Sequence, residues 1–217
     1  MTLLDQIALL LTGLVALYLV VRFFNDYRQH QGTHNVFYMI SFLVLLVAGL
    51  LLIAFTYDIL GSPWVVIVSA LIPICLSLGL VYEFYPNYGK LYLVVAIIGL
   101  IAMGVTRFTG PPTLATIFLI IVHSIAGILI ILTPILAARQ GLTSGGFIGV
   151  SIGGILIGLG GVALAFLKLG KQFLFFSQEF VFTILAPLLL LMVLCFAWGF
   201  MKKVKVPGSS TPQMRTA

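Results

Sequence analysis

The sequence predicts an all-α fold, a polytopic membrane protein built as a seven-transmembrane-helix bundle. Two observations lead to this prediction. The chain of 217 residues is 62% hydrophobic and 7% charged, with a mean hydropathy of +1.25. Its apolar residues also fall into seven runs, each near the ~20 residues that a helix needs to cross a hydrocarbon core. A water-soluble domain of this composition would lack the polar side chains to cover its surface.

The seven runs follow one another with short connections and leave no room for a second folded domain. They are Leu3–Phe24, Phe37–Phe55, Trp64–Val81, Leu91–Phe108, Leu114–Ala138, Phe147–Leu167 and Val181–Met201. Each run is expected to be helical, because an unpaired backbone group in lipid has no water to bond. Residues 1–205 are therefore predicted to form one transmembrane domain. The polar tail 206–217 is predicted to be a disordered cytoplasmic tail.

Prolines mark one predicted helix boundary and several bends. The turn Gly110–Pro112 is expected to stop the fourth helix and start the fifth, because proline is tolerated in a first helical turn. Three further prolines lie inside runs: Pro73, Pro134 and Pro187. Each removes a backbone hydrogen bond and tends to kink its helix. Ser69 and Ser77 share a face with Pro73 and are expected to bond the carbonyls that it frees.

The stretch Gly145–Ala165 is uncharged, long enough to cross a bilayer and rich in glycine. At helical spacing, its small residues form two ridges. One ridge is Ser151, Gly154, Gly158, Gly161 and Ala165, and the other is Gly146, Gly149, Gly153, Gly160 and Ala163. Small residues let membrane helices approach closely, so this helix is expected to pack on two sides at the centre of the bundle. Gly158→Leu is accordingly expected to disrupt the fold by overpacking.

Lysine and arginine are distributed unevenly between the two sides of the predicted bundle. One side collects Arg22, Arg28, Lys90, Arg139, Lys202, Lys203, Lys205 and Arg215, and the other Arg107, Lys168 and Lys171. Cytoplasmic loops carry the excess of cations, so the N-terminus is expected outside and the C-terminus in the cytoplasm of a plasma-membrane protein. The cations stand singly between apolar runs. This spacing argues against nucleic acid as a partner and leaves the lipid bilayer as the expected surroundings.

His123 is the most informative single residue of the sequence. It lies near the middle of the fifth run, where an ionisable group is costly and often functional. On a helix it shares a face with Thr116, Gly127 and Pro134, which directs it into the bundle. Three interpretations stay open: a heme or metal ligand, a hydrogen-bonding group in a small-molecule cavity, or a structural histidine bonded to a neighbouring helix. A second intramembrane histidine for a bis-histidine heme is absent from the sequence.

Two loops carry other candidate residues. His30 and His34 have the four-residue spacing of a zinc pair, but Gly32 interrupts the segment and a third ligand at motif spacing is missing, so a solvated loop is expected and no metal site is predicted. Tyrosines surround the turn 85–89, and phenylalanines fill the link before the last run, at Phe173, Phe175, Phe176 and Phe180. Both groups are expected to anchor the chain at the membrane interface, with a ligand mouth as the alternative.

Several function classes find no support. All five acidic residues fall at run ends or in loops, which disfavours ion-coupled transport and proton pumping. The seven crossings are similar in topology to those of microbial rhodopsins and G-protein-coupled receptors. The likeness ends there, because Val181–Met201 contains no lysine that retinal could be attached to. Ser, His and acidic residues converge at no membrane depth that would suit a hydrolase, so no enzyme activity is predicted.

Three functional hypotheses follow. The first is a non-enzymatic membrane protein that acts through helix packing as an accessory, assembly or sensory subunit of a membrane complex. Its expected partners are the other membrane-protein subunits of that complex. The alternative is a channel or facilitator for a small neutral or lipid-like solute. The third is an electron-transfer anchor that holds heme through His123. The predicted ligand or cavity-lining residues are His123, Thr116, Ser69, Ser77, Gly154 and Gly158, and the predicted helix-packing residues are Gly149, Gly153 and Gly161. The first two hypotheses need no cofactor.

Overall fold

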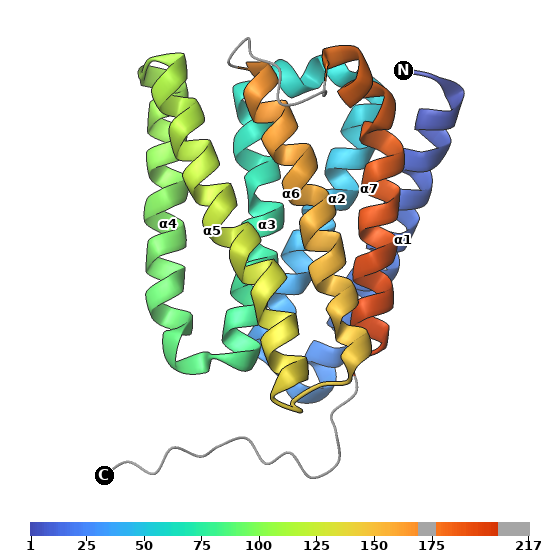
Figure 1. The fold of residues 1–217 in the computed structure, drawn as a ribbon, viewed down its shortest axis with the longest axis vertical. Coiled ribbons are helices and arrows are strands. Elements are labelled where there is room, and N and C mark those ends of the chain that lie inside the picture. The colour runs from blue at the N-terminus through green and yellow to red at the C-terminus, as the bar shows by residue number, and fades with distance from the viewer. Residues whose placement is uncertain (169–176, 204–217) are drawn as a thin grey trace.

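The computed structural model of the chain is all-helical over the residues that it describes, 1–168 and 177–203, where it contains no β-strand (Figure 1). The long helices are α1 (Leu3–His30), α2 (Thr33–Phe55), α3 (Pro63–Phe84), α4 (Pro86–Thr109), α5 (Pro112–Arg139), α6 (Gly149–Lys168) and α7 (Gln178–Met201). Two short 3₁₀ helices, η1 (Tyr57–Gly61) and η2 (Gly145–Ile148), precede α3 and α6. In the described ranges, seven helices are long and apolar enough to cross a membrane.

Six of the helices form a ring in the order α1, α2, α3, α5, α6, α7, with α7 returning to α1, and α4 packs outside the ring on α3 and α5 (Figure 1). The N-terminal end of the bundle carries the start of α1, the 3₁₀ helix η1 and the turn between α4 and α5. The opposite end, the basic end, carries the described cations other than Arg107 and Lys168. The predicted tail 206–217 and the phenylalanines 173, 175 and 176 lie outside the described residues.

Local sequence explains where several helices begin and end. Thr2 and Asp5 form a reciprocal capping box that satisfies two N–H groups at the start of α1. The turn Gly110–Pro112 stops α4 and places a proline in the first turn of α5, as the sequence predicted. The loop expected around His30 and His34 is shorter than predicted. His30 ends α1 and His34 lies in the first turn of α2, because only Gln31 and Gly32 connect the two helices, and Gln31 has a left-handed φ of 52°.

The sequence predicted that the glycine-rich helix lies at the centre of the bundle, and this prediction is wrong. The most enclosed helix is α3. Within its most apolar window, 67% of α3 is buried, against 33% for Gly145–Val162. One face of α6, with Ile152, Ile155 and Leu159, points outward. The first four residues of the glycine-rich stretch, Gly145–Ile148, form the 3₁₀ helix η2 and not α-helix. Ridges of small residues show which sides of a helix pack, but they do not show what lies on its third side.

The prediction that α6 packs on two sides is confirmed. A Cβ atom built on Gly153 would lie 2.5 Å from the Phe196 ring of α7, and one built on Gly154 would lie 2.7 Å from Ile130 of α5. Gly149 likewise faces α7, where its Cβ would meet the Trp198 ring and the Cys195 carbonyl. Gly149 and Gly153 therefore belong to the α7 side and Gly154 to the α5 side, which matches the two predicted ridges.

The closest approach of a glycine to the backbone of another helix occurs at a residue that sequence analysis did not single out. A Cβ atom on Gly199 of α7 would lie 2.5 Å from the backbone nitrogen of Val150 and 3.0 Å from the carbonyl carbon of Gly149. Backbone cannot move aside as a flexible side chain can, so position 199 accepts only glycine at this separation. The signal in the sequence was slight: Gly199 is a lone glycine in the last apolar run.

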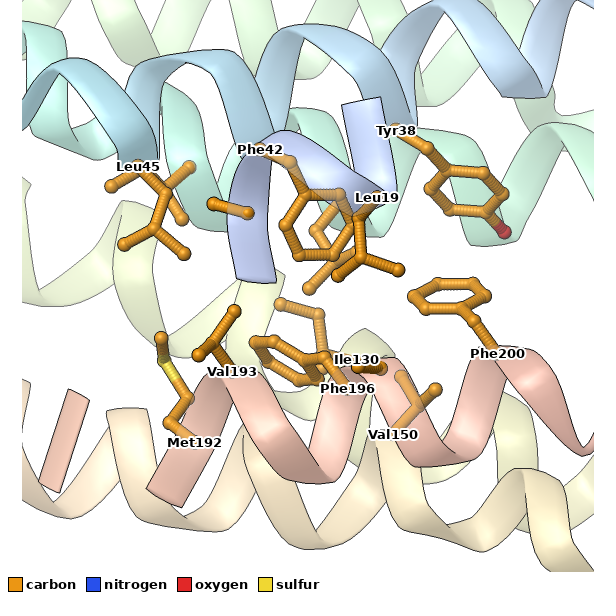
Figure 2. Packing of buried hydrophobic residues seen from close by; sticks show 14 of the residues in the cluster. Leu19, Tyr38, Phe42, Leu45, Ile130, Val150, Met192, Val193, Phe196 and Phe200 are labelled. Atoms are coloured by element: carbon orange, nitrogen blue, oxygen red, sulfur yellow. The ribbon is translucent and has the colours of Figure 1, made fainter. Parts of the chain in front are cut away.

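Aromatic side chains fill the basic half of the bundle (Figure 2). Tyr38 and Phe42 of α2 face Phe196 and Phe200 of α7, and the rings of Tyr38 and Phe200 are 4.9 Å apart in an edge-to-face arrangement. Phe23 of α1 adds a further ring, 5.0 Å from Phe200. Edge-to-face pairs contribute about 0.5–1.5 kcal/mol each beyond burial of their area. The basic half is therefore densely packed across the ring of helices.

We expect Gly199→Ala to destabilise the protein by about 1–3 kcal/mol, because the added methyl group overpacks a backbone contact. Gly158→Ala is the matched control. No atom lies within 4 Å of a Cβ built on Gly158, and alanine stabilises a helix by about 1 kcal/mol relative to glycine. Thermal unfolding of both variants in detergent tests the difference. A Gly199→Ala variant as stable as Gly158→Ala would contradict the contact.

Candidate functional site

Helices α5 and α6 are close together in the basic half of the bundle and separate toward the N-terminal end (Figure 1). Near the basic end, the Ser151 hydroxyl of α6 donates a hydrogen bond of 2.7 Å to the Ile131 carbonyl of α5. Gly154 packs on Ile130 one turn further along. Beyond that level the contact opens, since a Cβ atom on Gly127 or on Gly158 would meet nothing within 4 Å. The seam between α5 and α6 is thus closed in one half and open in the other.

Two cavities adjoin each other at this opening. The central cavity, of about 170 Å³, lies inside the ring, and all its described lining residues are buried or half-buried. The lateral cavity, of about 300 Å³, lies in the seam between α5 and α6. Its lining includes the exposed residues Ser124, Ile128 and Val162, so it opens on the outer surface of the bundle. Among the described residues, both cavities share Pro73, His123, Ile157 and Gly161.

His123 of α5 therefore stands in the wall between the two cavities. Its Nδ1 atom lies 3.2 Å from the Leu119 carbonyl oxygen one turn earlier. A carbonyl can only accept, so Nδ1 carries the hydrogen, and the neutral ring then keeps an acceptor lone pair on Nε2. Across the seam, a Cβ atom on Gly161 would lie 4.0 Å from Cδ2 of the same ring. The glycine leaves room for the imidazole between α5 and α6.

The lining of the central cavity is mainly aliphatic. Within the described part of the chain, its polar side chains are Thr12 of α1, Ser69 of α3 and His123. The Thr12 hydroxyl donates to the Ala8 carbonyl at 2.8 Å, and the Ser69 hydroxyl donates to the Val66 carbonyl at 3.0 Å. Both hydroxyl hydrogens are thus committed to the residues' own helices. What each hydroxyl retains is acceptor capacity.

The structure places only part of the predicted set around the cavities. His123 lines both cavities, Ser69 the central one and Gly158 the lateral one. Gly161 was predicted to serve helix packing, but it lines both cavities. Gly158 also lacks the close contact that the expected effect of Gly158→Leu assumes, because a Cβ atom built on it would meet nothing within 4 Å. The spacing of small residues could not distinguish a contact from a cavity, because both require the same residue type.

Three predicted lining residues line neither cavity, which corrects the sequence-based set. Thr116 is buried and donates to the Pro112 carbonyl. Ser77 is buried and bonds the Ile74 carbonyl and, at 2.7 Å, the Tyr92 hydroxyl of α4. Gly154 packs on Ile130. They share a helical face with true lining residues, but each lies at a level where a neighbouring helix fills the space.

The expectation that Ser69 and Ser77 bond the carbonyl freed by Pro73 is also wrong. Pro73 has no N–H, so the carbonyl four residues earlier, that of Ser69, lacks its helical donor. The two serine hydroxyls bond the carbonyls of Val66 and Ile74 instead. Pro73 therefore leaves a further acceptor, the Ser69 carbonyl, on a residue that lines the central cavity.

A polar cluster that sequence analysis missed lies at the basic end. Glu83 at the end of α3 forms an ion pair with Lys203, with Nζ 2.8 Å from Oε1, and both side chains are 18% exposed. The Tyr38 hydroxyl donates to the second Glu83 oxygen, also at 2.8 Å. Arg22 of α1 donates to the Phe200 carbonyl at 3.0 Å and so joins the end of α7 to α1. The cluster joins four helices where the aromatic packing ends.

At the N-terminal end, η1 lies beside the central cavity and contributes Ile59 and Leu60 to its lining. Tyr57 of η1 stacks on Phe182 of α7 with ring centroids 5.4 Å apart. Its hydroxyl is buried without a hydrogen-bond partner among the described residues. Burial and the nearby Asp5 carboxylate raise the pKa of the Tyr57 phenol to about 12, so it stays neutral at ordinary pH. A neutral aromatic pair therefore lies at this end.

Metal ligands do not gather in the described residues, since no three His, Cys, Asp or Glu side chains are placed to hold an ion together. His30 Nδ1 lies 3.3 Å from the Asp26 carbonyl, and the His34 ring packs on Tyr38. Both cysteines are free thiols. The two cavities offer a few hydrogen-bonding groups in a largely apolar lining.

Comparison with known protein families, with curated proteins and with solved structures finds no match for this chain. Over residues 1–168 and 177–203, the fold defines the class only as far as a bundle of seven helices that are each long and apolar enough to cross a membrane.

We expect Glu83→Ala to lower the free energy of unfolding by about 1–3 kcal/mol, because it leaves the half-buried Lys203 ammonium and the Tyr38 hydroxyl without their acceptor. The control is Glu179→Ala at the exposed start of α7, where Thr183 donates to the backbone carbonyl of residue 179 rather than to its side chain. That change is expected to alter stability by less than about 0.5 kcal/mol. Chemical unfolding in detergent measures both, and equal losses would show that the Glu83 cluster contributes nothing.

Proposed function

We propose that this chain is a multi-pass integral protein of the plasma membrane that binds a small, neutral, mostly apolar molecule inside its helix bundle. The observation that carries the proposal is the pair of adjoining cavities with His123 in their shared wall. Apolar cavities of ~150 Å³ in proteins take up small apolar molecules readily, so this volume and lining suit such a ligand.

Charge supports the membrane orientation that we propose. The described lysine and arginine side chains at the basic end outnumber those at the N-terminal end. With the positive-inside rule, this asymmetry favours a cytoplasmic basic end and an outside N-terminus. The central cavity, which reaches η1, then lies toward the outer leaflet.

The position of the lateral cavity supports an entry route from the bilayer. A molecule dissolved in the hydrocarbon core reaches the exposed lining residues Ser124, Ile128 and Val162 without crossing either end of the bundle. From there the wall formed by His123 and Gly161 leads to the central cavity. Such lateral access suits a lipid-like molecule rather than an ion.

A binding or sensory role fits the packing better than an open channel does. The aromatic cluster around Phe42, Phe196 and Phe200 fills the basic half of the ring, and the Glu83 cluster lies beyond it. A pore along the bundle axis would have to displace both. A purely packing role as an accessory subunit also loses support, because the close contacts of α6, at Gly149, Gly153 and Gly154, are already made with α7 and α5.

The test is photolabelling in lipid nanodiscs with a diazirine-bearing 1-dodecanol, followed by mass spectrometry of the labelled peptides. We expect saturable labelling of α5 and α6 segments around His123. Gly49→Leu, which fills the central cavity, is expected to reduce this labelling at least about fivefold, because the Cβ of residue 49 meets only the Leu9 carbonyl, at 3.7 Å.

Gly104→Leu on α4 is the matched control, since its Cβ meets only Ile67, at 3.9 Å, and it lines neither cavity. Its labelling should equal that of the wild type. Labelling that does not saturate, or that Gly49→Leu leaves unchanged, would overturn the proposed function.

A further inference from the structure

The hydrogen-bonding groups of the central cavity share one property that the proposed binding function does not require. Each polar side chain that lines it, within the described residues, offers an acceptor and no free donor. The Thr12 and Ser69 hydroxyls give their hydrogens to carbonyls of their own helices. His123 gives its Nδ1 hydrogen to Leu119 and keeps the Nε2 lone pair.

The backbone adds to the same pattern. Away from the first turns of α3 and η1, where Val65 and Ile59 lie, the helical N–H groups around the cavity are used within their helices, and Pro73 has none to offer. The Ser69 carbonyl, which Pro73 leaves without its donor, is one more acceptor on a residue that lines the cavity. The remaining described lining is aliphatic, glycine or the Met192 thioether, itself a weak acceptor.

We infer that the ligand is a lipophilic alcohol: an apolar chain or ring system with a hydroxyl group that donates its hydrogen to Nε2 of His123. The inference rests on the proposed function and names the chemistry of its ligand. The single hydroxyl hydrogen of an alcohol satisfies the Nε2 acceptor of His123 while its hydrocarbon part fills the aliphatic lining. An ether, ester or ketone of the same size brings only acceptors. Its oxygen would face the acceptor atoms around His123 and would be buried without a hydrogen-bond donor.

Charged head groups do not fit this site. The half-buried Glu83 and Lys203 side chains neutralise each other at the basic end, beyond the aromatic cluster, and the buried Asp5 carboxylate caps the start of α1. No lysine, arginine, aspartate or glutamate is among the described residues that line either cavity. A carboxylate or ammonium group in the central cavity would therefore be buried without a counter-charge. A neutral hydroxyl is the group that the lining accommodates.

The test uses competition in the nanodisc photolabelling with diazirine-bearing 1-dodecanol. Unlabelled 1-dodecanol is compared with its isostere lacking the donor, decyl ethyl ether, on the wild-type protein. We expect the alcohol to compete about tenfold better, the ratio that one unsatisfied hydrogen bond produces. Equal competition by the ether would overturn the inference while leaving the proposed function intact. If the labelling does not saturate, the proposed binding function itself is contradicted.

Variants separate recognition by His123 from a structural role. In His123→Leu the acceptor is gone, so the alcohol and the ether should compete equally. His123→Gln keeps a side-chain acceptor and is expected to restore part of the preference for the alcohol. Ser77→Ala removes a hydroxyl that lies outside both cavities and should leave the tenfold preference unchanged. A preference that persists in a folded His123→Leu protein would contradict the assignment of His123 as the acceptor.

Discussion

The rest of the structure depends on the backbone contact between the start of α6 and the end of α7. Gly149, Gly153 and Gly199 remove the side chains that would hold these helices apart. With α7 against α6, the Phe196 and Phe200 rings reach Phe42 and Tyr38 of α2 and close the ring of helices. The Lys203 ammonium also reaches Glu83. Close backbone approach in one half of the molecule thus determines the aromatic packing and the polar cluster together.

The same helix makes a different contact with α5, and this asymmetry generates the site. Ser151 and Gly154 bring α6 against α5 near the basic end, whereas Gly158 and Gly161 face open space and the His123 ring. One glycine ridge therefore serves as a contact at its start and as a cavity wall at its end. A polar ring in the middle of an apolar helix is tolerated there because its Nδ1 hydrogen bonds within α5 and the residue lines both cavities.

Composition and local signals were enough to predict the seven helices, the turn at Gly110–Pro112 and the two packed sides of α6. They also pointed to His123, because an ionisable residue inside an apolar run stands out in any sequence. The choice among its neighbours failed for Thr116, Ser77 and Gly154. Periodicity assigns a residue to a helical face, but the level at which a neighbouring helix fills that face depends on crossing geometry, which no local pattern encodes.

Two features escaped prediction for a related reason. The pairing of Glu83 with Lys203 joins residues 120 positions apart, and each looked like an ordinary charge at a helix end. The importance of Gly199 depends on the backbone of a different helix. The outward face of α6 could not be predicted either, since an isoleucine and leucine face suits lipid and protein interior equally. Long-range placement, rather than residue chemistry, was the missing information.

Close contact of α6 with α5 and α7 in the basic half leaves an accessible cavity around His123 in the other half. Crystals of the protein equilibrated under xenon pressure test this most directly, because xenon enters apolar cavities in proteins and scatters strongly. We expect xenon density beside Pro73, His123 and Gly161, inside the ring and in the α5–α6 seam. Xenon confined to the outer surface, with side chains filling the space around His123, would contradict it.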